Sequence, residues 1–166
     1  MPVSQLTTVG ILPAGIHLCS WQEVYERFVK SFGDERGPRK PLAEAALVVL
    51  TRLAAEAVEN AWIGGSFVTN KPVPADIDVV FEVAPGHRKE YWRDGEMRRI
   101  AGNDADTRAK LLHRVGVHAF PTSAGFVAGG VWIPILDGFQ WTKPDAQGNR
   151  QPKGIIGLDL RCLPSP

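Results

Sequence analysis

The amino-acid sequence predicts an α/β or α+β fold in which helices pack mainly on one face of a mixed sheet. Segments with helical character are interleaved with short apolar segments that resemble strands. A length of 166 residues with 44% hydrophobic residues suits one domain with a single core. We therefore expect one domain over residues 1–166. Its first 19 residues should form an irregular arm, because Pro13 and Gly15 interrupt any helix there.

Helices are expected in four segments. The sequence Ser20-Trp21-Gln22-Glu23 is a capping box that predicts a helix through about Phe32. A charged loop over 33–41 leads to a second helix over 42–60, which is rich in Ala, Leu and Glu. Two polar helices should follow over 85–94, with an extension to Arg99 left open, and over 104–114.

Strands are expected where short apolar runs occur. These runs cover residues 61–63, 76–83, 115–120 and 154–160. Residues 66–71 should make a short helical turn, and Pro72 and Pro74 then force an extended path. Residues 121–152 are rich in glycine and proline and predict a long loop with one strand over 131–136.

Two aspartates stand in alternate positions at the start of the predicted strand 76–83. Side chains two residues apart on a strand point to the same face, so Asp76 and Asp78 should lie side by side. Ile77, Val79 and Phe81 should point the other way, into the core. Because two adjacent carboxylates repel each other, such a pair usually needs a divalent cation. Their oxygen atoms suit Mg²⁺ or Mn²⁺.

A Gly-Gly-Ser turn precedes the aspartate pair. Gly64 and Gly65 have no Cβ, so their backbone N–H groups can approach a phosphate closely, and Ser66 adds a hydroxyl. Lys71 could reach a phosphate from the same turn or could be a solvated loop lysine. Metal-binding carboxylates next to a phosphate-binding turn indicate a site that handles nucleotides.

The spacing of these two motifs resembles a known superfamily. Gly-Ser, nine residues and Asp-x-Asp is the pattern of the nucleotidyltransferase superfamily, which includes DNA polymerase beta-like and minimal nucleotidyltransferases. The fuller string Gly-Ser-Phe-Val-Thr-x-Lys-Pro-x-Pro-x-Asp-Ile-Asp is similar to that of a small bacterial and phage family. Leu12 to His17 and Lys153 to Ile156 also resemble that family, so the similarity covers roughly residues 11 to 160.

The resemblance implies a reaction and roles for residues. Asp76 and Asp78 would hold two Mg²⁺ ions, while Ser66 and the amides of Gly64 and Gly65 would bind the phosphates of an NTP. The expected reaction transfers a nucleoside monophosphate to a hydroxyl of a protein, an RNA or a small molecule. The sequence leaves the acceptor open.

Relatives usually carry a third carboxylate on a following strand, and this sequence has His118 at the expected place. Histidine can bind a metal or accept a proton, but it brings no negative charge, and a purely structural role is the alternative. By composition alone, the third acid could instead be Glu82, Asp137 or Asp159.

Other residues are weaker candidates for the site. His17 could pack near the site or lie on the surface, and Trp141 could stack on a base or belong to the core. Four cationic residues could contact phosphate or be solvated: Arg114, Lys143, Arg150 and Lys153.

Composition restricts the remaining classes. A net charge of +1 argues against a strongly electrostatic grip on long nucleic acid. No run of about 18 apolar residues occurs, so we expect no membrane span. Cys19 and Cys162 are too few for a disulfide framework and suit reduced thiols in a cytoplasmic protein.

A second class of function remains open from the sequence. The lack of a clear third carboxylate would also suit a catalytically weakened nucleotidyltransferase fold that binds or regulates a protein partner. Such a module could belong to a toxin–antitoxin or phage-defence system.

Overall fold

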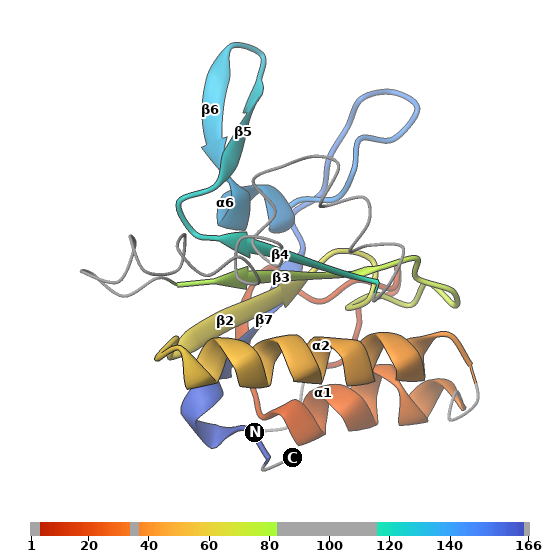
Figure 1. The fold of residues 1–166 in the computed structure, drawn as a ribbon. Coiled ribbons are helices and arrows are strands. Elements are labelled where there is room, and N and C mark those ends of the chain that lie inside the picture. Colours follow the sequence, from red (N-terminus) through yellow and green to blue (C-terminus); the bar gives the residue numbers. More distant parts are fainter. Residues whose placement is uncertain (1–3, 34–36, 83–115, 165–166) are drawn as a thin grey trace.

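A computed structural model describes residues 4–33, 37–82 and 116–164 and confirms the predicted fold class. Within these residues the structure contains a mixed five-stranded sheet, a separate two-stranded sheet and helices (Figure 1). The predicted helices over 85–94 and 104–114, and Arg114 with them, lie outside the described residues.

The five-stranded sheet has the order β1-β7-β2-β3-β4. Strand β1 pairs in parallel with β7, and β3 pairs in parallel with β4, whereas β2 is antiparallel to both β7 and β3. The strands span Gly15–Leu18 (β1), Asn60–Gly64 (β2), Ile77–Phe81 (β3), Val117–Pro121 (β4) and Gly154–Asp159 (β7). The sheet is therefore mixed, as the sequence predicts.

Two helices cover one face of this sheet. Figure 1 shows α1 (Trp21–Phe28) and α2 (Arg39–Ala55) side by side beneath the strands. Ile77, Val79 and Phe81 of β3 are at most 1% exposed and belong to the hydrophobic core that includes residues of both helices. Burial of such side chains is the main stabilising contribution to a fold of this size. The other face of β3, which carries Asp78, points away from α1 and α2.

The first helix is shorter than the sequence predicts. The capping box is confirmed, because the Ser20 hydroxyl accepts a hydrogen bond from the Glu23 backbone N–H and the Glu23 carboxylate accepts one from the Ser20 backbone N–H. However, α1 ends at Phe28, and a 3-10 turn, η1 (Lys30–Phe32), replaces the last predicted turn. The break falls at Val29, where φ −118° and ψ −67° depart from helical values.

The second helix begins earlier and ends earlier than predicted. It starts at Arg39, inside the predicted loop, because a proline at position 41 is tolerated in the first helical turn, where backbone N–H groups have no partner within the helix. It ends at Ala55 rather than near Asn60. Ala57 adopts a left-handed conformation (φ 61°), and the Val58 N–H bonds to the Leu53 carbonyl, so the chain turns back toward β2.

Further sequence predictions are correct only in part. The N-terminal arm is not irregular throughout, because Gly15–Leu18 form β1 at the edge of the sheet. In the segment 121–152 the strand predicted over 131–136 is present as β6 (Val131–Pro134), but the segment is not otherwise a loop: β6 pairs with β5 (Gly125–Ala128) in an antiparallel hairpin, and the short helix α6 (Ile135–Phe139) follows. Residues 65–68 form turns, with no helix assigned among them.

A second layer lies on the other side of the sheet. In Figure 1, α6 and the hairpin lie on the side of the sheet opposite α1 and α2, and the hairpin projects away from the sheet.

Among the described residues no helix has the length and apolar character required to cross a membrane. Cys19 and Cys162 are free thiols.

Candidate active site

Strand register brings Asp78 and His118 together. Asp78 pairs with Gly64 on one side and with His118 on the other, so the three positions form a line across β2, β3 and β4. Paired positions in adjacent strands direct their side chains to the same face. Asp76 precedes β3 by one residue and shares this face by the two-residue period. The predicted Asp-x-Asp geometry is thus confirmed.

The three side chains converge closely. His118 Nδ1 lies 3.4 Å from Asp78 Oδ1 and 3.8 Å from Asp76 Oδ2. One ligand atom from each residue can be chosen so that all three atoms lie within 4.8 Å of one another. The side chains are 14–28% exposed, so the cluster is shielded but open to solvent. Two carboxylate oxygens and an imidazole nitrogen at this spacing are a chemically suitable donor set for one divalent cation.

The electrostatics of the cluster agree with a cation site. Burial and the neighbouring Asp78 carboxylate raise the pKa of Asp76, although His118, Lys143 and Lys71 oppose the shift. The ionised form of Asp76 is therefore disfavoured when no cation is bound. A divalent cation would reverse this effect, because it stabilises both carboxylates in their charged form.

A cavity of about 740 Å³ surrounds the cluster, a volume typical of small-molecule sites. Gly65, Ser66 and Lys71 line it together with Asp76, Asp78 and His118. Four candidates that the sequence left open also line it: Trp141, Lys143, Arg150 and Lys153. Together with Lys71, the three cationic candidates make four cationic side chains that line the same cavity as the two carboxylates. This arrangement suits an anionic ligand accompanied by a metal ion.

The two glycines of the turn have different roles from the expected one. Gly64 is the last residue of β2 and does not line the cavity. A Cβ at this position would lie 3.1 Å from Phe139 of α6. Gly65 does line the cavity, with φ 70°, and a Cβ there would collide with Asp78 Oδ2. The missing side chains therefore make room for Phe139 and for the Asp78 carboxylate, in addition to any phosphate.

Lys153 is more closely integrated in the site than the sequence suggests. It is 8% exposed, and its Nζ donates a hydrogen bond of 3.3 Å to the Gly65 carbonyl. Burial lowers the pKa of Lys153, whereas the Asp78 carboxylate raises it. The ammonium group thus lies close enough to Asp78 to interact with its charge and holds the Gly65 backbone at the same time.

Arg39 supports the site without lining the cavity, a role that the sequence analysis missed. Its side chain is fully buried, and its two terminal nitrogens donate hydrogen bonds to the carbonyls of Phe67 (2.7 Å), Thr69 (2.9 Å) and Lys71 (2.5 Å). The guanidinium also lies 3.9 Å from the centre of the Phe32 ring. A buried charge is stable only with partners of this kind. The same bonds connect the Ser66–Lys71 loop to α2 and hold it in place. Nothing in the local sequence distinguishes Arg39 from the other charges of the segment 33–41.

The N-terminal arm supports the same loop from a second side. Ile11 forms an isolated bridge with Thr69, and the Asn70 N–H donates to the Gly10 carbonyl (2.8 Å). Gly10 has φ 78°, and a Cβ there would collide with the Asn70 side chain. The Ser66–Lys71 loop is therefore held by backbone contacts to both α2 and the arm, so its cavity-lining groups are positioned before any ligand binds.

Aromatic rings pack in a row beside the His118 imidazole. The His118 ring lies 5.9 Å from Phe120, which in turn lies 5.9 Å from Phe139 of α6. Phe120 is two residues after His118 and so shares its face of the sheet. The short helix α6, which the sequence did not predict, therefore packs against the residues that orient His118.

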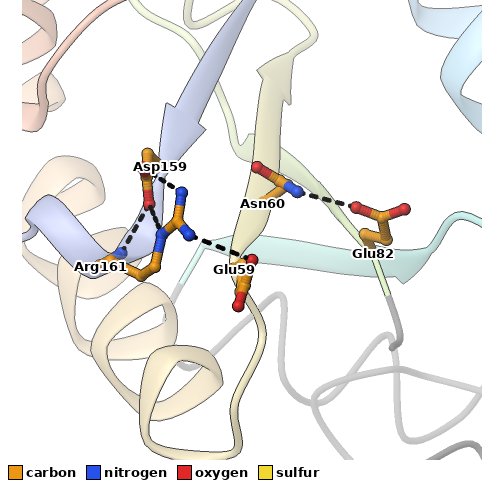
Figure 2. A network of polar contacts seen from close by, with 5 residues as sticks. All are labelled: Glu59, Asn60, Glu82, Asp159 and Arg161. Carbon is orange, nitrogen blue, oxygen red and sulfur yellow. Dashed lines mark hydrogen bonds and ion pairs between the residues drawn. The ribbon is translucent and has the colours of Figure 1, made fainter. Parts of the chain in front are cut away.

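The alternative third acids lie elsewhere. Figure 2 shows Glu82 and Asp159 in a separate polar network, in which Asn60 donates to Glu82 (2.9 Å) and Arg161 binds Asp159 (2.8 Å). Glu82 is four residues from Asp78, about 13 Å along an extended strand. Asp137 is in α6 and exposed, and it does not line the cavity. In the described part of the chain, Asp76 and Asp78 are the only carboxylates that line this cavity.

His17 also lies outside the site. Its ring nitrogens contact the Ser4 hydroxyl (3.0 Å) and the Pro13 carbonyl (2.7 Å) in the N-terminal arm. His17 does not line the cavity. Its contacts indicate a structural role within β1.

Comparison with protein families places the chain in one family. Residues 4–159 match the model of DUF6932, a family of unknown function. The chain belongs to this family. No match was found among curated proteins or among solved structures. The resemblance to nucleotidyltransferases therefore stays a prediction from the Gly-Ser and Asp-x-Asp motifs.

Proposed function

We propose that this protein catalyses metal-dependent transfer of a nucleoside monophosphate from an NTP to a hydroxyl group. The observation that carries the proposal is the convergence of Asp76, Asp78 and His118 inside a cavity that the Gly65–Ser66 turn also lines. The sequence motifs predicted that the carboxylate pair and the turn belong to one site. Their meeting in one cavity supports a single site for metal and phosphate.

Asp76 and Asp78 would hold the divalent cation through their carboxylate oxygens. A metal ion in such a site neutralises phosphate charge and orients the transferred group for in-line displacement. The two carboxylates would hold the cation on the face of β3 that points away from α1 and α2, in the cavity that the Gly65–Ser66 turn also lines. Because three protein donors do not fill an octahedral shell, oxygens of the nucleotide phosphates would complete it. The cation should therefore bind weakly alone and better with an NTP.

The phosphates would be bound by the rest of the cavity wall. Ser66 offers its hydroxyl, and the rigidly held loop presents Lys71 on the same side. Lys143 and Arg150 line the cavity from the segment that leads from α6 to β7. Hydrogen bonds between charged groups are stronger than neutral ones, so these cations suit a triphosphate. Trp141, which is 47% exposed and also lines the cavity, could stack on the base.

The acceptor hydroxyl would enter the open side of the cavity. Two segments border it there: the β5–β6 hairpin contributes Phe126, and the segment after α6 contributes Trp141. In Figure 1 the hairpin and residues 141–152 both rise from the same side of the sheet. A protein side chain, an RNA 3′ end and a small molecule all remain candidate acceptors.

The decisive experiment is incubation of the protein with each α-³²P-labelled NTP, Mg²⁺ or Mn²⁺, and a cell extract. We expect transfer of label to an acceptor by the wild type and no transfer by Asp76→Asn/Asp78→Asn. Asp159→Asn is the matched control, because this carboxylate lies outside the cavity, and it should transfer label normally. Equal labelling with wild type and the double variant would contradict the proposal.

A second candidate function is a binding or regulatory module for a protein partner. It is favoured by one observation: the third donor of the described cluster is His118 rather than a carboxylate, so the cluster holds less negative charge than the three carboxylates that the resemblance to nucleotidyltransferases implies. A module of this kind would bind an NTP in calorimetry but transfer no label with any nucleotide. Introducing the missing acid with His118→Asp would then be expected to create or raise transfer.

A further inference from the structure

The third ligand of the cluster carries information about which metal the site takes. Magnesium binds oxygen ligands in a near-ideal octahedron and keeps several waters, whereas imidazole nitrogen suits first-row transition ions. The Nδ1 atom of His118 faces both carboxylates, at 3.4 Å from Asp78 and 3.8 Å from Asp76. The cluster therefore combines one nitrogen donor with the oxygen donors of two carboxylates.

We propose that His118 is a metal ligand through Nδ1 and that it makes this site selective for Mn²⁺ over Mg²⁺. This inference rests on the metal site of the proposed function, but it does not depend on nucleotide transfer. Manganese accepts an oxygen-rich octahedral site that contains one nitrogen, and divalent first-row ions bind nitrogen donors more strongly than Mg²⁺ does.

The observed spacing is close to what a bound ion requires. An octahedral ion with bonds of about 2.1 Å holds neighbouring ligand atoms about 3 Å apart. The separations of 3.4 and 3.8 Å between His118 and the two carboxylates exceed this value slightly. Small rotations of the carboxylate groups would close the difference, so no backbone movement is needed.

The surroundings of His118 favour a fixed ligand rather than a mobile proton acceptor. Its ring packs against Phe120, which contacts Phe139 of α6, and Phe139 occupies the space that the lack of a side chain at Gly64 leaves open. Supporting contacts of this kind orient metal ligands and raise affinity for the ion. The strand register adds a backbone constraint, because His118 pairs directly with Asp78.

The charge balance agrees with one cation rather than two. Two carboxylates are the only anionic groups among the described residues that line the cavity, and Lys153 already interacts with Asp78. A neutral imidazole adds a donor without adding negative charge. The two carboxylates can therefore balance the charge of at most one divalent ion, and a second ion would depend on the charge of a phosphate ligand.

Electron paramagnetic resonance of Mn²⁺ added to the metal-free protein tests the assignment without nucleotide or activity. In the wild type we expect electron spin echo modulation from a directly bound ¹⁴N nucleus, replaced by ¹⁵N couplings when histidine is ¹⁵N-labelled. Competition with Mg²⁺ should show a preference for Mn²⁺ of about tenfold or more.

Variants then separate His118 from the other histidines. His118→Asp should lose the nitrogen coupling and reduce the preference for Mn²⁺ by about tenfold, because the donor set becomes all oxygen. His17→Asn is the matched control: this ring lies outside the cavity, so coupling and selectivity should not change. Absence of nitrogen coupling in the wild type, or unchanged selectivity in His118→Asp, would overturn the inference.

The outcomes also distinguish this inference from the proposed function. Nitrogen-coupled Mn²⁺ in a protein that binds no NTP would support His118 as a ligand and remove the nucleotidyltransferase proposal. NTP transfer supported equally by Mg²⁺ and Mn²⁺, with no nitrogen coupling, would support the transferase and remove the ligand role of His118.

Discussion

The two ends of strands β2, β3 and β7 carry groups of carboxylates in opposite electrostatic situations. At one end, Arg161 contacts Asp159 at 2.8 Å and Glu59 at 3.4 Å, and Asn60 donates to Glu82 (Figure 2). At the other end, Asp76 and Asp78 stand side by side with His118. Hydrogen bonds from Arg161 lower the pKa of Asp159, while burial and Asp78 raise the pKa of Asp76.

The difference lies in the groups that each end provides as partners. Arg161 binds Asp159 through two nitrogens and the backbone N–H, a geometry that favours the ionised carboxylate. Asp76 has Lys71 and Lys143 in its vicinity, but their effect is smaller than that of burial and Asp78. Asp159 and Glu59 are thus paired with a cation of the chain itself. The Asp76–Asp78 pair retains a repulsion that a bound cation would remove, which is a common property of functional sites.

The largest difference between the two ends should appear in metal binding. Asp76→Asn/Asp78→Asn should abolish metal-dependent NTP binding, because it removes both oxygen ligands of the cation. Asp159→Asn/Glu82→Gln, which removes the same number of carboxylates from the other end, should leave binding unchanged. Calorimetric titration of an NTP in the presence of Mg²⁺ or Mn²⁺ measures the effect. If the two double variants behave alike, the cluster is not the binding site.

A second test disturbs the end of the strands that carries Asp76, Asp78 and His118, without changing its charge. Gly65→Val should abolish NTP binding, because its Cβ would collide with Asp78 Oδ2 and because φ 70° is strained for valine. Gly33→Val is the matched control, since Gly33 has φ 66° and open space around the Cβ position. Both variants should lose stability from strain, but only Gly65→Val should lose binding. Normal NTP affinity in a folded Gly65→Val protein would contradict the role of the turn.

The phosphate-binding role of the same turn has a smaller expected effect. Ser66→Ala should weaken NTP binding by roughly 1.5–3 kcal/mol, the contribution of one hydrogen bond to a charged group. This corresponds to about a ten- to hundredfold rise in Kd. Metal binding by the protein alone should not change, because Ser66 is not part of the three-residue donor cluster. Calorimetry with and without nucleotide separates the two, and unchanged nucleotide affinity would exclude the Ser66 hydroxyl as a ligand.

The sequence predicted the local part of this site well. Alternation along one strand placed Asp76 and Asp78 on one face. His118 was expected on the following strand, and β4 pairs with β3 so that His118 lies directly opposite Asp78. These inferences need only the two-residue period of a strand and the order of strands. The Gly65–Ser66 turn reached the cavity for the same reason, since β2 ends at Gly64, directly beside Asp78.

The sequence did not predict features that depend on distant contacts. β1 is a strand because it pairs in parallel with β7, which lies more than a hundred residues later in the chain. The buried position of Arg39 depends on carbonyl groups roughly thirty residues away. In the segment 121–152, the glycines at 129 and 130 form the tip of a hairpin with four-residue strands, too short to show a clear period. Tertiary contacts, rather than local preference, determine these elements.

The smallest expected effect is on stability, where the two ends should respond with opposite signs. Because the pKa of Asp76 in the folded protein is above its ordinary value of 3.8, the fold favours the protonated acid. This contribution is present below the unfolded pKa and is lost as the pH rises through the folded pKa. Asp76→Asn should therefore stabilise the metal-free protein near neutral pH and have little effect in acid.

Asp159→Asn should do the reverse. The pKa of Asp159 is below its ordinary value of 3.8, so its stabilising contribution is present above the unfolded pKa and is lost as the pH falls through the folded pKa. The variant should thus be slightly destabilised near neutral pH and resemble the wild type in acid. Urea unfolding in the presence of a chelator, from about pH 3 to pH 7, measures both curves. Destabilisation of both variants at neutral pH would show that the Asp76–Asp78 pair is not strained in the metal-free protein, and the contrast between the two ends would fail.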